Sequence, residues 1–452
     1  MKIFNKKAKE CSVKILFCFF LSFCAAAGFA YTERQVQDMS AQSESLISDG
    51  NYDAALKTLL DIFPSAQNDD DKTQIQFLIA MASAAKGDNA TAEWVLRRIL
   101  KNRPWLTRVR LELALLYYKT GKDTKADYHF RLALGGRDLP PEVRQKIAYF
   151  LYQIRYRKKW DGYLNLGVTP DSNVNNASVA ELDCINFFGM PLCRKLENRR
   201  SSIGLSGFAG VENYLRMSKN IRWKTTLTGG VADYSGREYD IYSVGGSTGP
   251  LYNFTRGFAG LYGGATRVWY GGKGLLYDAG PLAEFSYDLS SRVTAGINGS
   301  LKFSTFDNDM YDYLTGSSVS VMPTLYYALT SKSFILLKPS AEFMNTRYDW
   351  ADKDSYKIAV GFGIELPLGV SLYLEPSYGN ARARGKRVYT LFEPAQRRTD
   401  DSYAISVRLL NRQINVYGFT PTLNYSYTDV KSNIKNMSYN KHTVELGITN
   451  RF

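Results

Sequence analysis

The residue types that could do acid–base chemistry are few in this chain. His129 and His442 are the only two histidines, and neither belongs to a serine–histidine–acid set of the kind that drives acyl transfer. Asp69, Asp70 and Asp71 could bind a cation, but an acidic helix start explains them better. We therefore expect no enzyme, no cofactor and no metal centre.

Several carboxylates in the C-terminal half stand on the polar side of segments with alternating polarity. Two facing carboxylates could act as a glycosidase pair. Basic residues occupy the same side of these segments, however, so a charged network inside a barrel explains them better. The residues expected to line that interior are Lys357, Glu365, Glu375, Arg408, Lys441 and Glu445.

Cys184 and Cys193 are the cysteines that remain after the N-terminal thirty residues. When an exported protein has just two cysteines, they are expected to form a disulfide with each other. Two free thiols or a metal pair are the alternatives, although no nearby histidine would complete a metal site.

The last thirteen residues, 440–452, alternate with the period of a β-strand. Val444, Leu446 and Ile448 fall on one face, and charged residues fall on the other. A strand with one apolar face and one polar, solvated face suits the wall of a membrane barrel. An edge strand of a soluble sheet is the alternative. The final Phe452 resembles the outer-membrane insertion signal of bacterial barrel proteins.

The first thirty residues predict a secretory signal. Lysines precede an apolar run over 13–27, and small residues follow as far as Ala30. The run is too short for a transmembrane helix, so we expect cleavage after Ala30. Cys24 follows the bulky Phe23, which argues against a lipoprotein signal.

The remaining chain contains no apolar stretch of the length that a spanning helix needs. An exported chain that sits in a membrane without such helices must form a closed barrel. The 32 tyrosines suit the girdles of aromatic residues that a membrane barrel carries, and the 36 glycines suit its strands. The net charge of +14 suits lipopolysaccharide phosphates or an acidic partner, and nucleic acid is not expected for an exported chain.

Residues 31–158 have a helical period and an internal repeat. Gly50, Gly87 and Gly121 recur at intervals of roughly 35 residues, which is the tetratricopeptide spacing. The sequence predicts a tetratricopeptide-like solenoid over 31–158, and a plain helical bundle is the alternative. The basic run at 144–159 is either a collar at a membrane-facing rim or a solvated helix face.

From residue 159 to residue 452 the polarity alternates, which predicts a transmembrane antiparallel β-barrel of about 14 strands. Connections are short after even strands and longer or more polar after most odd ones. Since barrels have short periplasmic turns and long outer loops, we expect the helical domain in the periplasm. Strands are expected to start near Trp160, Ser202, Ile221, Tyr239, Arg256, Leu275, Arg292, Gly316, Ser333, Ser355, Val370, Ser402, Ile414 and Asn440. The expected fold class is thus α+β multidomain.

One expected outer loop is rich in basic residues, with little acid to offset them. Contact with lipopolysaccharide or exported cargo is one explanation, and simple solubility is the other. The residues are Arg382, Arg384, Lys386, Arg387, Arg397 and Arg398.

A signal, a short repeat domain and a fourteen-strand barrel together resemble the surface lipoprotein assembly modulator family, also called type XI secretion outer-membrane proteins. Residues 162–175, GYLNLGVTPDSNVN, are similar to the start of that family's barrel, where the first strand runs into an Asn-rich segment. The resemblance implies an outer-membrane translocator for surface lipoproteins or secreted soluble proteins, whose helical domain receives the client.

The resemblance also implies the partners. They are a protein client, outer-membrane lipid and lipopolysaccharide, the barrel-assembly machinery and periplasmic chaperones. Two alternatives stay open from the sequence, a polysaccharide export barrel and a passive porin with a periplasmic repeat domain.

Overall fold

The computed structural model describes residues 31–136, 139–187, 190–389 and 394–450. The chain divides into two compact units between Val95 and Leu96, and each is described by itself. The expected signal sequence with its cleavage site at Ala30, and the expected insertion signal at Phe452, lie outside the described residues. The domain boundaries expected from the sequence stay a prediction.

The first unit is helical. Its elements are α2 (Glu33–Ser48), α3 (Tyr52–Ile62), η1 (Phe63–Ser65), α4 (Asp69–Lys86) and the beginning of α5 (Asn89–Asn102). Leu59, Ile62 and Ile75 are fully buried in its core. Helix α4 begins at Asp69, and the Asn68 side chain caps it by accepting a hydrogen bond from the Asp71 amide at 2.6 Å.

A glycine followed five residues later by a fully buried alanine recurs three times along the helical region. Each glycine has a positive φ, which glycine adopts without the steric cost of a Cβ atom and which suits the end of a helix. The pairs are Gly50 and Ala55, Gly87 and Ala92, and Gly121 and Ala126. The expected helical region is confirmed, and its tetratricopeptide character stays a prediction.

The second unit contains the rest of α5, three further helices and the barrel. The helices are α6 (Thr107–Lys119), α7 (Asp123–Ala133) and α8 (Pro141–Arg157). Phe130 of α7 stacks on Phe150 of α8 with ring centroids 5.5 Å apart. Among the helices that the structure describes, none is long and apolar enough to cross a membrane.

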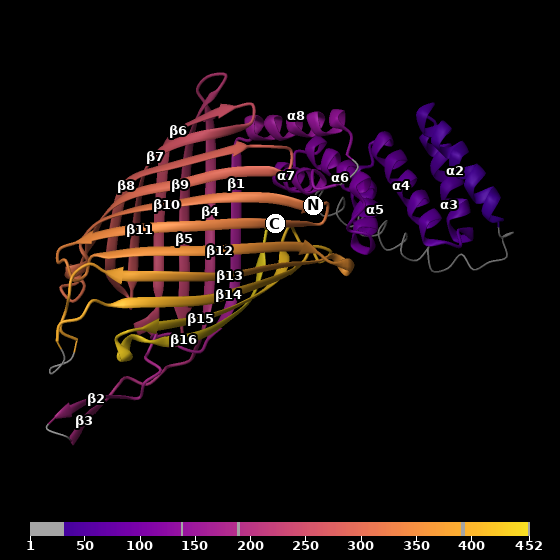
Figure 1. Ribbon diagram of the computed structural model, residues 1–452. Helices are drawn as coiled ribbons and strands as arrows, with labels where there is room; N and C mark the ends of the chain where they lie inside the picture. Colours follow the sequence, from indigo (N-terminus) through magenta and orange to yellow (C-terminus); the bar gives the residue numbers. More distant parts are fainter. Residues whose placement is uncertain (1–30, 137–138, 188–189, 390–393, 451–452) are drawn as a thin grey trace, which may run out of the picture. The chain divides into compact units, whose positions relative to one another are not determined.

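Fourteen antiparallel strands form a closed barrel, which confirms the expected architecture (Figure 1). Around the wall, β1 lies between β4 and β16, and the other strands follow in sequence order. The strands are β1 (Trp160–Asp171), β4 (Ser202–Arg216), β5 (Ile221–Tyr234), β6 (Ile241–Phe254), β7 (Gly257–Tyr270), β8 (Lys273–Asp288), β9 (Val293–Phe306), β10 (Gly316–Thr330), β11 (Ser333–Thr346), β12 (Lys353–Glu365), β13 (Val370–Ala383), β14 (Thr399–Asn411), β15 (Thr420–Ser432) and β16 (Tyr439–Thr449).

The outer face of the wall is apolar. Ile203, Leu205 and Leu227 are each more than 60% exposed, and similar side chains recur on strands around the barrel. An apolar surface of this extent is unfavourable in water. It is the surface that a barrel presents to lipid.

The two ends of the barrel differ. The connections after β4, β6, β8, β10, β12 and β14 define the short-turn end, and those after β1 and the other odd-placed strands define the long-loop end. The first long loop carries a separate ribbon of β2 (Leu182–Phe187) and β3 (Met190–Lys195), which was not predicted from the sequence.

One expected strand start is wrong. The strand expected near Ile414 begins at Thr420 as β15. Before it, Val416 pairs with Phe419 across a tight turn, in which Tyr417 and Gly418 both have positive φ. The reversal of the chain at these two residues prevents the strand from starting earlier.

Candidate functional site

Helices α6, α7 and α8 lie against the short-turn end of the barrel. These helices, the loops beside them and Arg97 of α5 contact the connections after β6, β8, β10 and β14. Because these turns lie on opposite sides of the fourteen-strand ring, the helices extend across its mouth. The hydrogen bonds are Arg155 Nη2 to the Thr255 carbonyl (2.9 Å), Arg292 Nη2 to the Gly136 carbonyl (2.7 Å), Ser331 Oγ to the Trp105 carbonyl (2.8 Å) and Gln413 Nε2 to the Arg97 carbonyl (3.2 Å).

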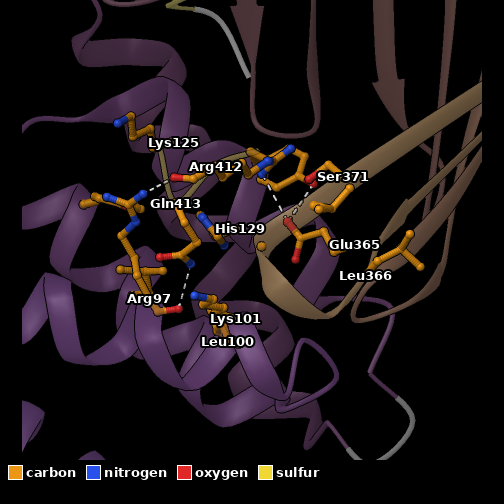
Figure 2. A pocket seen from close by; sticks show the side chains of 15 residues that line it. Arg97, Leu100, Lys101, Lys125, His129, Glu365, Leu366, Ser371, Arg412 and Gln413 are labelled. Atoms are coloured by element: carbon orange, nitrogen blue, oxygen red, sulfur yellow. Dashed lines mark hydrogen bonds and ion pairs between the residues drawn. The ribbon is translucent and has the colours of Figure 1, made fainter. Parts of the chain in front are cut away.

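A buried carboxylate lies at the end of β12, next to the short turn that follows it. Glu365 is the last residue of that strand, and it accepts from Arg110 Nη2 of α6 at 2.5 Å and from the Tyr128 hydroxyl of α7 at 2.9 Å. Arg412 Nη1, in the turn after β14, donates to Glu365 Oε1 at 3.1 Å, the same oxygen that accepts from Tyr128. Figure 2 shows Glu365 and Arg412 beside His129 at this junction. We call Arg110, Tyr128, Glu365 and Arg412 the mouth cluster.

The mouth cluster is closely packed. The Arg110 side chain is 0% exposed and that of Glu365 is 12% exposed. The Arg412 guanidinium stacks on the Tyr128 ring at 3.9 Å from its centroid, an attractive arrangement in a desolvated place. Removing one partner of an ion pair this buried strongly destabilises the protein, because the other charge is left uncompensated.

The sequence predicted Glu365 in the barrel interior but did not predict its partners. Arg110 lies among the buried positions Val109, Leu113 and Ala114 of α6. A lone arginine at a core position of a helix requires an acidic partner, and this was the available signal. The identity of that partner, 255 residues away, is not encoded by any local spacing.

His129 of α7 adjoins the mouth cluster. Its Nδ1 lies 3.3 Å from Arg110 Nη1, and its ring contacts those of Tyr117 and Tyr128. Burial, together with the Arg110 charge, holds the pKa of His129 well below its usual value. The imidazole is therefore neutral and can accept from the guanidinium.

The lowered pKa of His129 predicts that acid loosens the helices. The ordinary histidine pKa is about 6.5. Below this pH, His129 becomes protonated when the helices are undocked or unfolded, whereas it stays neutral when they are docked. The contribution of His129 to the stability of the docked helices is therefore constant above that pH, and it falls by up to about 1.4 kcal/mol per pH unit below it. Hydrogen exchange of α7 at pH 7.5 and pH 5.5 should show this loss in the wild type and a smaller one in His129→Gln. Equal losses in both proteins would contradict the assignment.

A second charged cluster lies at the connection after β8. Asp288 pairs with Arg131 of α7 at 3.5 Å and with Arg155 of α8 at 3.2 Å. The basic run at 144–159 therefore contributes Arg155 to the barrel rim, whereas Arg157 pairs with Asp123 of α7. Two helices are thus anchored to one carboxylate of the wall.

Gly135, just after α7, lies directly against the turn after β10. A Cβ atom at this position would come within 2.4 Å of the Thr330 carbonyl oxygen. We predict that Gly135→Ala displaces the end of α7 at a cost of about 1–3 kcal/mol, seen as faster tryptic cleavage of α6–α8 in detergent. Gly263→Ala, where a Cβ would meet nothing within 4 Å, is the control. Equal cleavage of the two variants would rule out a close approach at Gly135.

The other expected interior residues lie at different heights of the barrel. Glu375, Arg408 and Glu445 line one cavity of about 580 Å³. Lys357 lines a second cavity. Lys441 lies toward the long-loop end, where its Nζ is 2.7 Å from Asp171.

These interior charges have opposite or polar partners. Glu375 pairs with Lys338 at 2.6 Å, and Arg408 Nε donates to Asn424 Oδ1 at 2.8 Å. Lys224 lies between two carboxylates, 3.6 Å from Glu212 and 3.3 Å from Glu284. The interior surface is thus polar and of mixed charge.

The outer-loop basic residues are distributed over the long-loop end. Arg384 pairs with Asp354 at 2.5 Å, and Arg398 pairs with Asp400 at 2.8 Å. Arg387 lies 3.9 Å over the Trp350 ring. Arg382 belongs to β13, and Lys386 and Arg397 are exposed.

The cysteines lie opposite each other in the β2–β3 ribbon, since Cys184 is in register with Cys193. Directly opposed residues of an antiparallel pair have Cα atoms about 4.5–5.5 Å apart, within the range that a disulfide bridges. The disulfide itself stays a prediction.

Comparison with known proteins decides the family. A family model described as "Surface lipoprotein assembly modifier" matches residues 160–452, the whole barrel. The chain belongs to the surface lipoprotein assembly modifier family. This confirms the resemblance that the sequence suggested, and with the closed barrel and its exposed apolar wall it makes the protein an outer-membrane protein.

Curated relatives extend over the helical region as well. A surface lipoprotein assembly modifier of Pasteurella multocida is 23% identical over 422 residues, covering 88% of this chain and 80% of the relative. Surface lipoprotein assembly modifier 1 of Haemophilus influenzae is 22% identical, with 83% and 78% covered. A relative from Moraxella catarrhalis is 22% identical, with 87% and 76% covered. An anion-selective porin from Comamonas acidovorans aligns at 9% identity with a TM-score of 0.36, covering 65% of this chain and 99% of the porin, which is too low to support an inference.

Proposed function

We propose that this protein delivers surface lipoproteins or secreted soluble proteins across the bacterial outer membrane. The names of its relatives describe surface lipoprotein assembly, and its barrel matches the family over 160–452. The observation that carries the proposal is the position of α6–α8 across the short-turn mouth. A barrel closed by its own helices suits a passage that a client opens.

The short-turn end faces the periplasm in this proposal, as it does in other outer-membrane barrels. The helical region then lies in the periplasm, where it receives the client, either directly or from a chaperone. Engagement of the client releases the mouth cluster and the Asp288 cluster, and the barrel passes the client outward. Outer-membrane lipid, lipopolysaccharide and the barrel-assembly machinery are the other partners we propose.

The interior suits a polypeptide better than the alternatives. A polysaccharide exporter would be expected to carry a lumen dense in one sign of charge, whereas Glu375 pairs with Lys338 and Lys224 lies between Glu212 and Glu284. A passive porin would need an open mouth, whereas α6–α8 lie across this one. The charged side chains of the barrel interior form ion pairs with one another. We also propose that the protein is not an enzyme and requires no cofactor.

Surface display tests the proposed function. An epitope-tagged surface lipoprotein of the same bacterium, co-expressed with this protein, should be labelled by antibody on intact cells. Deleting residues 31–155 should weaken the labelling, because the receiving helices are lost. Glu342→Gln, an exposed carboxylate on the interior side of β11, is the control and should display normally. Labelling that does not depend on this protein would refute the proposal.

A further inference from the structure

The barrel closes where its first strand meets its last, and we call the pairing of β1 with β16 the seam. Among the described residues, β1 and β16 are in register at five residue pairs. By comparison, β1 and β4 are in register at twelve, and β15 and β16 at eleven. The register of the seam runs from Asn165 to Val168 and resumes only at Asp171.

A proline causes this interruption. The Ser172 amide donates to the His442 carbonyl at 3.0 Å. In an antiparallel pair the same hydrogen-bonding position returns two residues away, which places Pro170 opposite Val444. Proline has no N–H to donate, so the ladder loses a hydrogen bond between Val168 and Asp171. The pairings of β6 with β7 and of β8 with β9 also skip their prolines, so it is the short register, more than this gap, that distinguishes the seam.

Two glycines weaken the seam further. Gly167 is in register with Gly447, so neither position contributes a side chain of its own. The Glu445 side chain of β16 lies over Gly167 instead, and its Oε1 accepts from Asn165 Nδ2 across the seam at 2.9 Å. Glycine in a strand interior lowers its stability, and it often marks a close approach of two backbones. A Cβ atom on Gly447 would lie 2.4 Å from the Leu166 carbonyl oxygen, which shows how close the two strands are.

Side chains close the long-loop end of the seam instead. Asn173, in the Asn-rich segment that follows β1, is 0% exposed. Its Nδ2 donates across the seam to the Asn440 carbonyl at 3.0 Å, and its Oδ1 accepts from the Ala177 amide at 2.8 Å. The segment is therefore folded into a clasp that holds β16.

A buried ion pair adds to this clasp. Asp171, which is 3% exposed, lies 2.7 Å from Lys441 Nζ of β16. The Ser172 Oγ accepts from the His442 amide at 2.8 Å. We call Asp171, Ser172 and Asn173 the seam clasp.

Side chains also close the short-turn end. The Leu164 amide donates to Asn450 Oδ1 at 2.8 Å, where a regular ladder would use a backbone carbonyl. Thr449 Oγ1 donates to the Leu164 carbonyl at 3.3 Å. A backbone hydrogen bond also remains at each end, from the Ser172 amide to the His442 carbonyl and from the Asn450 amide to the Leu164 carbonyl. The seam is thus a short ladder supplemented by side-chain contacts, and separating it breaks fewer backbone pairings than separating β1 from β4 or β15 from β16.

We propose that the barrel wall opens at the seam and that an extended segment of the client pairs with the two edges that are freed. The inference rests on the proposed function and adds the site of client contact. Opening the seam would expose N–H and C=O groups of β1 and β16 at membrane depth, where water cannot satisfy them. An added β-strand satisfies them all, so the occupant is an extended polypeptide. A polysaccharide chain lacks the regular alternation of donors and acceptors that both edges require.

A reversible lock tests the inference. Asn165→Cys with Thr449→Cys places two cysteines at a pair in register across the seam. Ser300→Cys with Ser320→Cys is the control, since these two hydroxyls lie 2.7 Å apart between β9 and β10. Each protein is assembled in cells under reduction and then oxidised, and display of the epitope-tagged lipoprotein is measured before oxidation, after it and after reduction again.

We expect oxidation of the seam pair to reduce display to the level of cells without this protein, and reduction to restore it. The control pair should display normally throughout. Unchanged display with the seam oxidised would overturn the seam inference and leave the proposed function standing. Display that is independent of all variants would instead refute the proposed function. If the reduced seam variant already fails, Leu166→Cys with Ile448→Cys, the neighbouring pair in register, replaces it with the same two outcomes.

Discussion

Glu365→Gln is expected to open the mouth of the barrel. The change keeps the size of the side chain but removes the charge that compensates Arg110, which is 0% exposed. Removing one partner of a buried ion pair costs about 3–5 kcal/mol. If that cost falls on the docked state of the helices, the population with an open mouth rises by at least about a hundredfold. Planar bilayer recordings should then show frequent openings that the wild type lacks.

The control for this prediction is Glu342→Gln, which removes a carboxylate from the interior without touching the mouth. It should leave the conductance and the protease resistance of α6–α8 unchanged. A Glu365→Gln protein with the conductance and protease resistance of the wild type would show that the mouth cluster does not hold the helices.

Two truncations of different length are expected to separate the helical region into parts with different roles. Deleting residues 31–88 removes α2–α4 and keeps every mouth contact described above. Deleting 31–155 removes α6, α7 and nearly all of α8, including Arg110, Tyr128 and Arg131. The shorter deletion should leave the barrel closed, whereas the longer one should give a steady open current.

Bilayer conductance of the two purified truncated proteins checks this prediction, with heat-modifiable migration on gels as evidence that each barrel is folded. An open current after the shorter deletion would mean that residues 31–88 also close the mouth. A closed barrel after the longer deletion would mean that the helices do not close it at all.

The period of polarity was enough to predict the barrel. Ile358, Val360 and Phe362 alternate with Lys357, Gly361 and Gly363, and this places one face of β12 in lipid. Where the period is obscured, prediction failed. Tyr417 and Gly418 reverse the chain before β15, and the six-residue strands of the β2–β3 ribbon are too short to stand out within a polar loop.

The mouth cluster could be predicted only in part. Polarity placed Glu365 on the inner side of the wall, but its partners come from α6, α7 and the turn after β14, which no periodicity brings together. The same holds for Asp171 and Lys441, which meet because the first and last strands close the barrel. Local sequence patterns specify the elements, whereas these pairs depend on how the elements pack.

The most direct test of a client-opened passage is the conductance of the wild-type protein before and after a client is added. Purified protein in a planar bilayer should be nearly closed, because α6–α8 lie across the mouth. Adding a surface lipoprotein of the same bacterium, with its lipid removed, to the short-turn side should produce openings, and a denatured control protein should not. A large, constant conductance that the client leaves unchanged would contradict the account.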